Sequence, residues 1–226
     1  MSTSLIVNKY LALYNIIAAL LWFVILFQTL RDAIIFLNHD SDVEPTAECI
    51  YISHSYTDYP HKTLVLVQVF NAVVEISNAL LGIVKSSIPT VLLQFLARLL
   101  ITIGISYYVP ESEGNFHFMS YITLSLAWSV TEVIRYSFFS AKLVKNDIPY
   151  GLLWLRYSTF FILYPAGLFS ELYVVYLSLD SVRGYAYYWF LIFALTMYIP
   201  GFFVLYGYMI KQRKKVLNAS NAKKLQ

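Results

Sequence analysis

The amino-acid sequence predicts an all-α, polytopic membrane protein, a bundle of six transmembrane helices with both termini in the cytosol. The first observation is composition, because 59% of the 226 residues are hydrophobic and 13% are charged, against about 25% charged in an ordinary soluble domain. With a mean hydropathy of +0.62, the chain has too little polar surface to cover its apolar side chains in water. The other two observations are six apolar stretches of membrane-crossing length and an uneven distribution of positive charge between them.

A bilayer core of about 30 Å requires roughly 20 apolar residues in a helix. The first stretch is not a cleaved signal peptide, because it is longer than an h-region and no small-residue cleavage site follows it. Residues 31–62 form one long acidic loop that holds Cys49, and the other connections are short. We expect residues 1–226 to form a single membrane domain that ends in a basic cytosolic tail over residues 211–226. Its predicted spans are Tyr10–Leu30, Thr63–Val84, Thr90–Val109, Phe118–Ser140, Gly151–Ser178 and Tyr185–Ile210.

The distribution of Lys and Arg predicts the orientation, because positive charge in short loops marks the cytosolic side of a membrane. With the N-terminus inside, ten of the sixteen Lys and Arg residues lie on the inner side, three in outer loops and three within spans. Lys223 and Lys224, near the C-terminus, resemble the dilysine retrieval signal of endoplasmic reticulum membrane proteins. The alternative is a basic tail that is attracted to anionic lipid.

Charge, cysteine and histidine exclude several classes of protein. The net charge of +3 is small and is concentrated at one end of the chain, which argues against a nucleic-acid-binding protein. Cys49 is the single cysteine, so the chain forms neither an intrachain disulfide nor a cysteine-based metal site. All four histidines lie outside the apolar stretches and lack metal-ligand spacing. We therefore expect no metal site and no nucleic acid partner.

Six ionisable side chains lie inside the predicted spans, where each is costly unless it is paired or faces a cavity. One explanation is an internal ion-pair network, because Glu132 and Arg135 are three residues apart on one helix face and Glu75 could pair with Arg98 or Arg135. The alternative is that the arginines, which fall in the cytosolic half of their spans, hold phosphate groups by bidentate hydrogen bonds. The six residues are Glu75, Arg98, Glu132, Arg135, Arg156 and Glu171.

Glu171 differs from the others because its own span contains no basic residue near it. An isolated carboxyl group in an apolar bundle can act as an acid or a base near neutral pH. Tyr164 is seven residues earlier, so two helical turns place both side chains on one side about 10 Å apart along the axis. Pro165 predicts a kink beside the tyrosine, and the small residues Ala166 and Gly167 predict room for a substrate. The alternative is that both polar groups only bond a neighbouring helix.

Ordered motifs along the chain resemble the 3-hydroxyacyl-CoA dehydratases of very-long-chain fatty acid elongation, also called the protein tyrosine phosphatase-like family. The fungal members are the most similar, and the long acidic loop over residues 31–62 is the main departure. The resemblance runs from Tyr10 to the end of the sixth predicted span. The matching segments are Tyr10–Asn15, Val74–Gly82, Gln94–Arg98, Ala127–Tyr136, Leu155–Tyr157, Leu163–Leu172 and Tyr198–Phe202.

The resemblance implies an endoplasmic reticulum membrane enzyme that removes water from a (3R)-3-hydroxyacyl-CoA to give the trans-2-enoyl-CoA. It implies that Tyr164 and Glu171 are catalytic, and that no cofactor is needed. This is the third step of the elongation cycle, so its implied partners are the condensing enzyme and the ketoacyl and enoyl reductases, and its products feed sphingolipid precursors. A phosphatase is not expected, since Cys49 lies in an outer loop and no thiol occurs at Ala79–Gly82.

Two other functions remain open from the residues themselves. A transporter or channel could use the charges inside the spans as a conduction path, although such proteins often carry paired broken helices in corresponding halves. Pro165 and Pro200 lie in adjacent spans and do not pair in that way. A non-catalytic scaffold of the elongation complex is the other alternative, and it would not need Tyr164 or Glu171.

Overall fold

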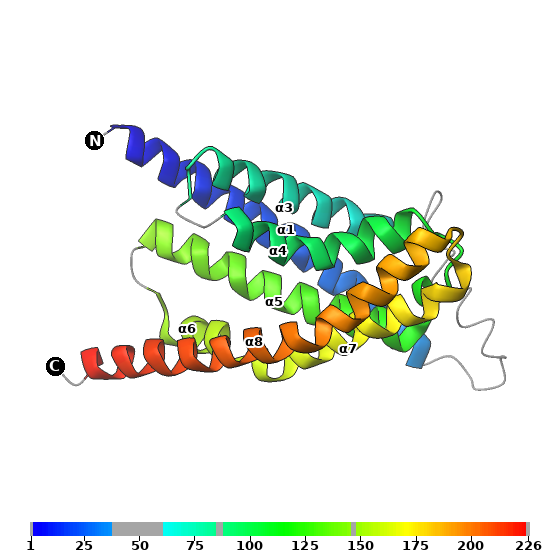
Figure 1. The fold of residues 1–226 in the computed structure, drawn as a ribbon. Helices are drawn as coiled ribbons and strands as arrows, with labels where there is room; N and C mark the ends of the chain where they lie inside the picture. The colour runs from blue at the N-terminus through cyan, green and yellow to red at the C-terminus, as the bar shows by residue number, and fades with distance from the viewer. Residues whose placement is uncertain (1, 38–60, 85–87, 146–147, 225–226) are drawn as a thin grey trace.

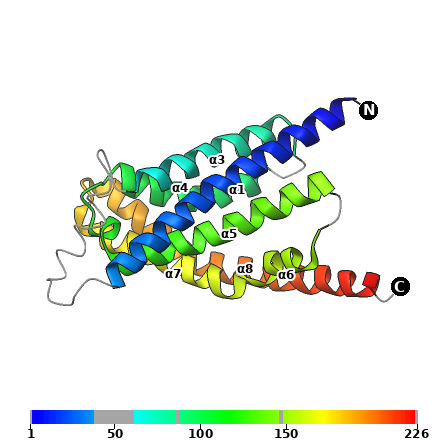
Figure 2. The same ribbon diagram turned by 180° about the vertical axis from the view of Figure 1, so that it is seen from behind.

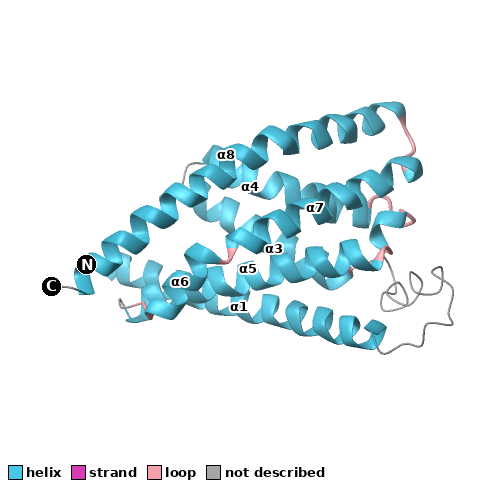
Figure 3. Ribbon diagram, turned by 90° about the horizontal axis from the view of Figure 1, so that it is seen from below, coloured by secondary structure: helices cyan, strands magenta, loops and turns pink. Residues whose placement is uncertain are grey.

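The computed structural model describes residues 2–37, 61–84, 88–145 and 148–224, and these residues are almost entirely helical (Figure 3). The predicted all-α class is therefore confirmed for this part of the chain. The long loop with Cys49 and the last two residues lie outside the described residues. In chain order the helices are α1 (Ser2–Leu37), α3 (Lys62–Leu80), α4 (Ile88–Leu99), η1 (Leu100–Tyr107), η2 (Glu113–Asn115), α5 (Phe118–Lys145), α6 (Tyr150–Ser158), α7 (Phe160–Ser178), η3 (Leu179–Ser181) and α8 (Tyr185–Lys224).

Among the described residues, four helical segments are long and apolar enough to cross a membrane: Leu5–Ile34, Lys62–Leu80, Tyr150–Ser181 and Tyr185–Asn218. The predicted third span contains a shorter apolar helix, Phe95–Tyr107. The predicted fourth span lies in α5, which is helical throughout but carries charged side chains and packs against α1 and α7. A helix that is covered by its neighbours presents little surface to lipid, so its own hydropathy can be low. Six spans therefore stay a prediction.

The helices lie side by side along the bundle, and both chain ends are found at the same end of it (Figures 1 and 2). The turn between α7 and α8, coloured yellow to orange, lies at the opposite end (Figure 1). In α1, Leu13, Leu20 and Phe27 share one outward face and are exposed. Apolar side chains at that spacing on an outer face are typical of a helix in contact with lipid.

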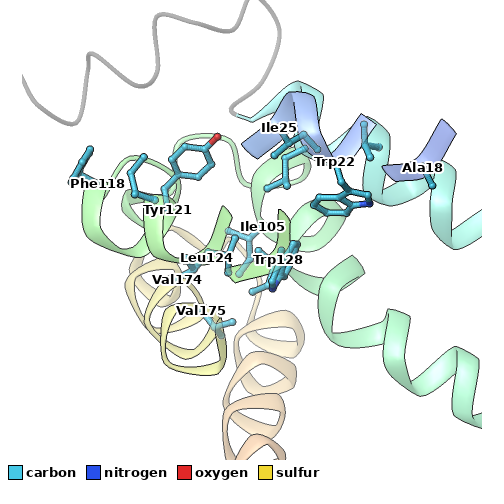
Figure 4. Close-up of a cluster of buried hydrophobic side chains, with 14 of the residues drawn as sticks. Ala18, Trp22, Ile25, Ile105, Phe118, Tyr121, Leu124, Trp128, Val174 and Val175 are labelled. Carbon is cyan, nitrogen blue, oxygen red and sulfur yellow. The ribbon is translucent and has the colours of Figure 1, made fainter. Parts of the chain in front are cut away.

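The core lies where α1, η1, α5 and α7 meet (Figure 4). Ala18, Trp22 and Ile25 of α1 recur at intervals of three or four residues and are almost completely buried. They pack in one cluster with Ile105 of η1 and Val175 of α7. The buried face of α1 lies opposite the exposed Leu13, Leu20 and Phe27, so burial determines which side of the helix faces the core.

Several helices extend beyond the predicted spans, such as α8, which continues to Lys224. Two other differences have a local cause. α3 ends at Leu80 rather than Val84, because Gly82 adopts a left-handed conformation with φ of 67°. The amides of Gly82 and Ile83 bond back to the carbonyls of Ala79 (3.2 Å) and Asn78 (2.9 Å). This is a Schellman motif, which ends a helix by satisfying its last carbonyls.

The predicted fifth span is divided into α6 and α7, and the division lies at Thr159 rather than at Pro165. The amide of Ile162 bonds to the Thr159 carbonyl at 3.2 Å, a tighter turn than that of an α-helix. Pro165 is the sixth residue of α7, so it removes an amide from the helix interior, yet the helix continues through it. α8 likewise continues through Pro200.

Candidate active site

Four of the six charged residues in the predicted spans form one ion-pair network that joins α3, α4 and α5. Arg135 binds Glu75 with two nitrogens, Nη2 to Oε1 at 2.6 Å and Nη1 to Oε2 at 3.1 Å. Its Nε donates to Glu132 Oε2 at 2.6 Å, across the predicted spacing of three residues. Arg98 Nη1 donates to the other oxygen of Glu132. The alternating charges compensate one another, which is the condition for keeping them away from water.

Tyrosines complete the network at Glu75. The Tyr136 hydroxyl donates to Glu75 Oε1 at 2.6 Å, and Tyr14 of α1 donates to the same atom at 3.4 Å. Arg156 is not part of this set: its guanidinium lies 5.8 Å from the centre of the Phe139 ring. Within the described residues no carboxylate forms an ion pair with it. The structure thus brings Arg98 and Arg135 together with the two glutamates and leaves Arg156 apart.

Glu171 is buried where α5, α7 and α8 meet, with 9% of its surface exposed. Trp128 Nε1 of α5 donates to its Oε1 at 2.9 Å. The Tyr198 hydroxyl of α8 donates to its Oε2 at 3.0 Å. Both carboxylate oxygens therefore accept a hydrogen bond from a side chain of a different helix. The indole of Trp128 also lies under the Arg98 guanidinium, 5.0 Å from its carbon to the ring centre, and so connects Glu171 to the ion-pair network.

Tyr164 lies on the same side of α7 and also faces α8. Its ring is nearly parallel to that of Phe202, with centres 5.6 Å apart, and it is stacked at 6.2 Å on Tyr206. Tyr198, Phe202 and Tyr206 are spaced by four residues, so they share one face of α8. α7 and α8 run in opposite directions, so Tyr164 meets the later two and Glu171 meets the first. Both proposed catalytic side chains thus face the same neighbouring helix.

The helix face at Gly167 of α7 lies next to α5. A Cβ atom on Gly167 would lie 3.4 Å from the Ala127 Cβ and 3.9 Å from Trp128 Cδ1. These are ordinary van der Waals distances, so a methyl group would fit at this position. The predicted room for a substrate beside Ala166 and Gly167 therefore stays a prediction.

Sequence reasoning missed Trp128 and Tyr198 as partners of Glu171. Trp128 lies four residues before Glu132 and belongs to a segment that was singled out for its likeness to a family. Tyr198 lies in another such segment, and the four-residue spacing to Phe202 and Tyr206 was a further signal. Among the residues that the structure describes, no group of three or more His, Cys, Asp or Glu side chains could hold a metal. The arrangement offers a carboxylate with two hydrogen-bond donors and, on the same helix face, a phenol.

Comparison with known proteins identifies relatives over most of the chain. The family model described as protein tyrosine phosphatase-like protein, PTPLA, matches residues 69–219. A Caenorhabditis elegans protein named very-long-chain (3R)-3-hydroxyacyl-CoA dehydratase is 38% identical over 168 residues, covering 68% of this chain and 76% of that protein. A Schizosaccharomyces pombe protein named probable very-long-chain (3R)-3-hydroxyacyl-CoA dehydratase is 33% identical, and the match covers 96% of both chains. A Homo sapiens dehydratase of this name is 31% identical, over 93% of this chain and 82% of its own. No solved structure matches.

Proposed function

Because this chain belongs to the protein tyrosine phosphatase-like family, we propose that it dehydrates very-long-chain (3R)-3-hydroxyacyl-CoA to trans-2-enoyl-CoA. Two relatives that carry this name, from Schizosaccharomyces pombe and Homo sapiens, match over 96% and 93% of the chain. In a cycle of chain elongation, a reductase acting on a 3-ketoacyl-CoA must supply this substrate. A second reductase must consume the enoyl product, and a condensing enzyme must begin the next round. These enzymes are the expected partners.

Tyr164 and Glu171 are the proposed catalytic residues, and the observation that carries this assignment is the placement of both against α8. The thioester carbonyl makes the proton on C2 of the substrate removable, and Glu171 accepts it. The electrons of that C–H bond form the C2–C3 double bond while the C3–O bond breaks. The Tyr164 hydroxyl donates a proton to the departing oxygen, which leaves as water. The proton on Glu171 must then return to the Tyr164 phenolate, and with that transfer the scheme balances without a cofactor or a metal.

The contacts of Glu171 favour its role as the base. An indole N–H can only donate a hydrogen bond, so the Glu171 oxygen facing Trp128 must be an acceptor. Tyr198 donates to the other oxygen. Hydrogen bonds to both oxygens stabilise the carboxylate, whereas burial of the side chain favours the carboxylic acid. The carboxylate is the form that can take up a proton. With Glu171 assigned as the base, Tyr164 is assigned as the acid.

Arg98 and Arg135 have a supporting role in this proposal. Their charges are matched by Glu132 and Glu75, so binding a phosphate would require an existing ion pair to break. The network also positions Trp128, whose ring lies against Arg98. Arg156 has no such partner among the described residues and stays a candidate for the CoA phosphates.

We also infer an endoplasmic reticulum location, with six spans and both termini in the cytosol. Four helices of membrane-crossing character and the two chain ends at one end of the bundle (Figure 2) support this topology. The excess of Lys and Arg in the segments on that side supports the orientation. The side chains of Lys223 and Lys224 lie outside the described set, so the retrieval signal rests on the sequence.

The test is to supply the purified protein with a 3-hydroxyacyl-CoA and to measure the enoyl product. Tyr164→Phe and Glu171→Gln should each lower kcat by about 10²- to 10⁴-fold, the usual contribution of a general acid or base. Tyr176→Phe is the matched control, because Tyr176 is on the same helix but 62% exposed. Near-normal turnover in either variant would show that the assignment is wrong. If the protein does not dehydrate the substrate but moves acyl-CoA across vesicle membranes, the result favours a transporter. If it is needed only for assembly of the elongation complex, the result favours a scaffold.

A further inference from the structure

Arg213 of α8 lies beside α6 and the start of α7, far along the helix from Glu171. Its Nε donates to the Ser158 hydroxyl at 3.1 Å, and its guanidinium carbon is 5.4 Å from the centre of the Phe161 ring. Ser158 is buried and Arg213 is partly exposed. Within the described residues no carboxylate forms an ion pair with Arg213. The hydroxyl and the ring hold the guanidinium in one orientation and leave its two terminal nitrogens for another acceptor.

Arg213 belongs to the same face of α8 as the aromatic residues at the candidate active site. It follows Tyr206 by seven residues and Tyr198 by fifteen, which places all three within one side of a helix of 3.6 residues per turn. The Tyr206 ring contacts Phe160 of α7 at 5.6 Å between centres and Phe202 of its own helix at 5.2 Å. A continuous line of side chains therefore leads from Arg213 along α8 to the Glu171 carboxylate.

The length of this line matches the carrier group of the proposed substrate. Fifteen residues of α-helix separate Tyr198 from Arg213 by about 22 Å. The pantetheine arm of CoA has a backbone about as long as four extended residues, roughly 15 Å, and the phosphates that follow it add several more. An acyl thioester at Glu171 would thus place the CoA phosphates near Arg213. This relation also explains how a deeply placed carboxylate could reach a thioester whose nucleotide stays at the end of the bundle that holds both termini.

We propose that Arg213 binds a phosphate group of the CoA moiety, with the pantetheine arm along the aromatic face of α8 formed by Phe202 and Tyr206. The inference rests on the proposed function, since it assumes an acyl-CoA substrate. Arg98 and Arg135, which are nearer to Glu171, are already bound to carboxylates. A planar guanidinium held by a hydroxyl is well suited to phosphate oxygens.

The experiment compares two substrates, a 3-hydroxyacyl-CoA and the corresponding 3-hydroxyacyl-pantetheine, which lacks the phosphates. Arg213→Ala should raise KM for the CoA substrate by about 10- to 100-fold, the effect of a lost charge-assisted hydrogen bond, and should leave kcat within about twofold. The same variant should be no worse than wild type on the pantetheine substrate. Arg213→Lys should recover part of the loss. Lys214→Ala, an exposed neighbour, is the matched control and should change neither constant.

An equal loss on both substrates would show that Arg213 only maintains the structure, and an unchanged KM would show that it does not contact CoA. The affinity of the same proteins for free CoA is measured in parallel, so the site is tested even if neither substrate is dehydrated. If neither substrate is dehydrated, the proposed function fails. Weaker binding of free CoA by Arg213→Ala than by wild type would still support the phosphate site. Equal CoA binding by wild type and variant would overturn it.

Discussion

The two hydrogen bonds to Glu171 allow a quantitative prediction for Tyr198→Phe. The substitution removes the donor at 3.0 Å from Glu171 Oε2 and leaves the aromatic ring, so packing changes little. A hydrogen bond to a charged group contributes about 1.5–3 kcal/mol. Trp128 still holds the other oxygen, so the carboxylate keeps one donor. If the bond positions the base in the transition state, kcat should fall by about 10- to 100-fold, at 1.4 kcal/mol per factor of ten.

Steady-state dehydration with purified variants separates this role from a structural one. KM should change by less than about twofold, because the bond acts on the reacting group rather than on substrate binding. In a Glu171→Gln background, Tyr198→Phe should cause no further loss, since both act through one carboxylate. Tyr208→Phe is the control, because Tyr208 is on the same helix and 61% exposed. An unchanged kcat, or an equal loss with and without Glu171, would refute the reasoning.

Three further predictions concern stability in detergent. Glu132→Gln removes the carboxylate that Arg98 binds, which should cost about 3 kcal/mol and lower Tm by roughly 6–12 °C. A decrease in Tm of less than about 2 °C would contradict a structural role for the network. Burial lowers the pKa of His61 to about 4, whereas in the unfolded chain the imidazole takes up its proton near pH 6.5. The free energy of unfolding should therefore be highest above pH 6.5 and decrease from there toward pH 4. His61→Gln should reduce this dependence of stability on pH. Gly114→Ala should lower Tm by several degrees, because its Cβ would lie 2.5 Å from the Val174 carbonyl oxygen, while Gly151→Ala, in open space, should be neutral.

The helical class and the positions of the charged side chains follow from the sequence, because hydropathy and helical spacing are local properties. The pairing of Glu132 with Arg135 follows from their separation of three residues. The end of α3 also had a local signal in Gly82, whose left-handed conformation closes the helix. The interruption at Thr159 had none as clear, since Pro165 was the more conspicuous candidate and lies inside α7.

The partners of Glu171 could be decided only by the tertiary structure. Trp128 is 43 residues away and Tyr198 is 27 residues away. Each contact depends on how far one helix is rotated and shifted against another, and the spacing of residues along a single helix does not specify those quantities. Periodicity predicts which side of α7 holds Tyr164 and Glu171, whereas the packing of α7 against α5 and α8 decides which side chains reach Glu171.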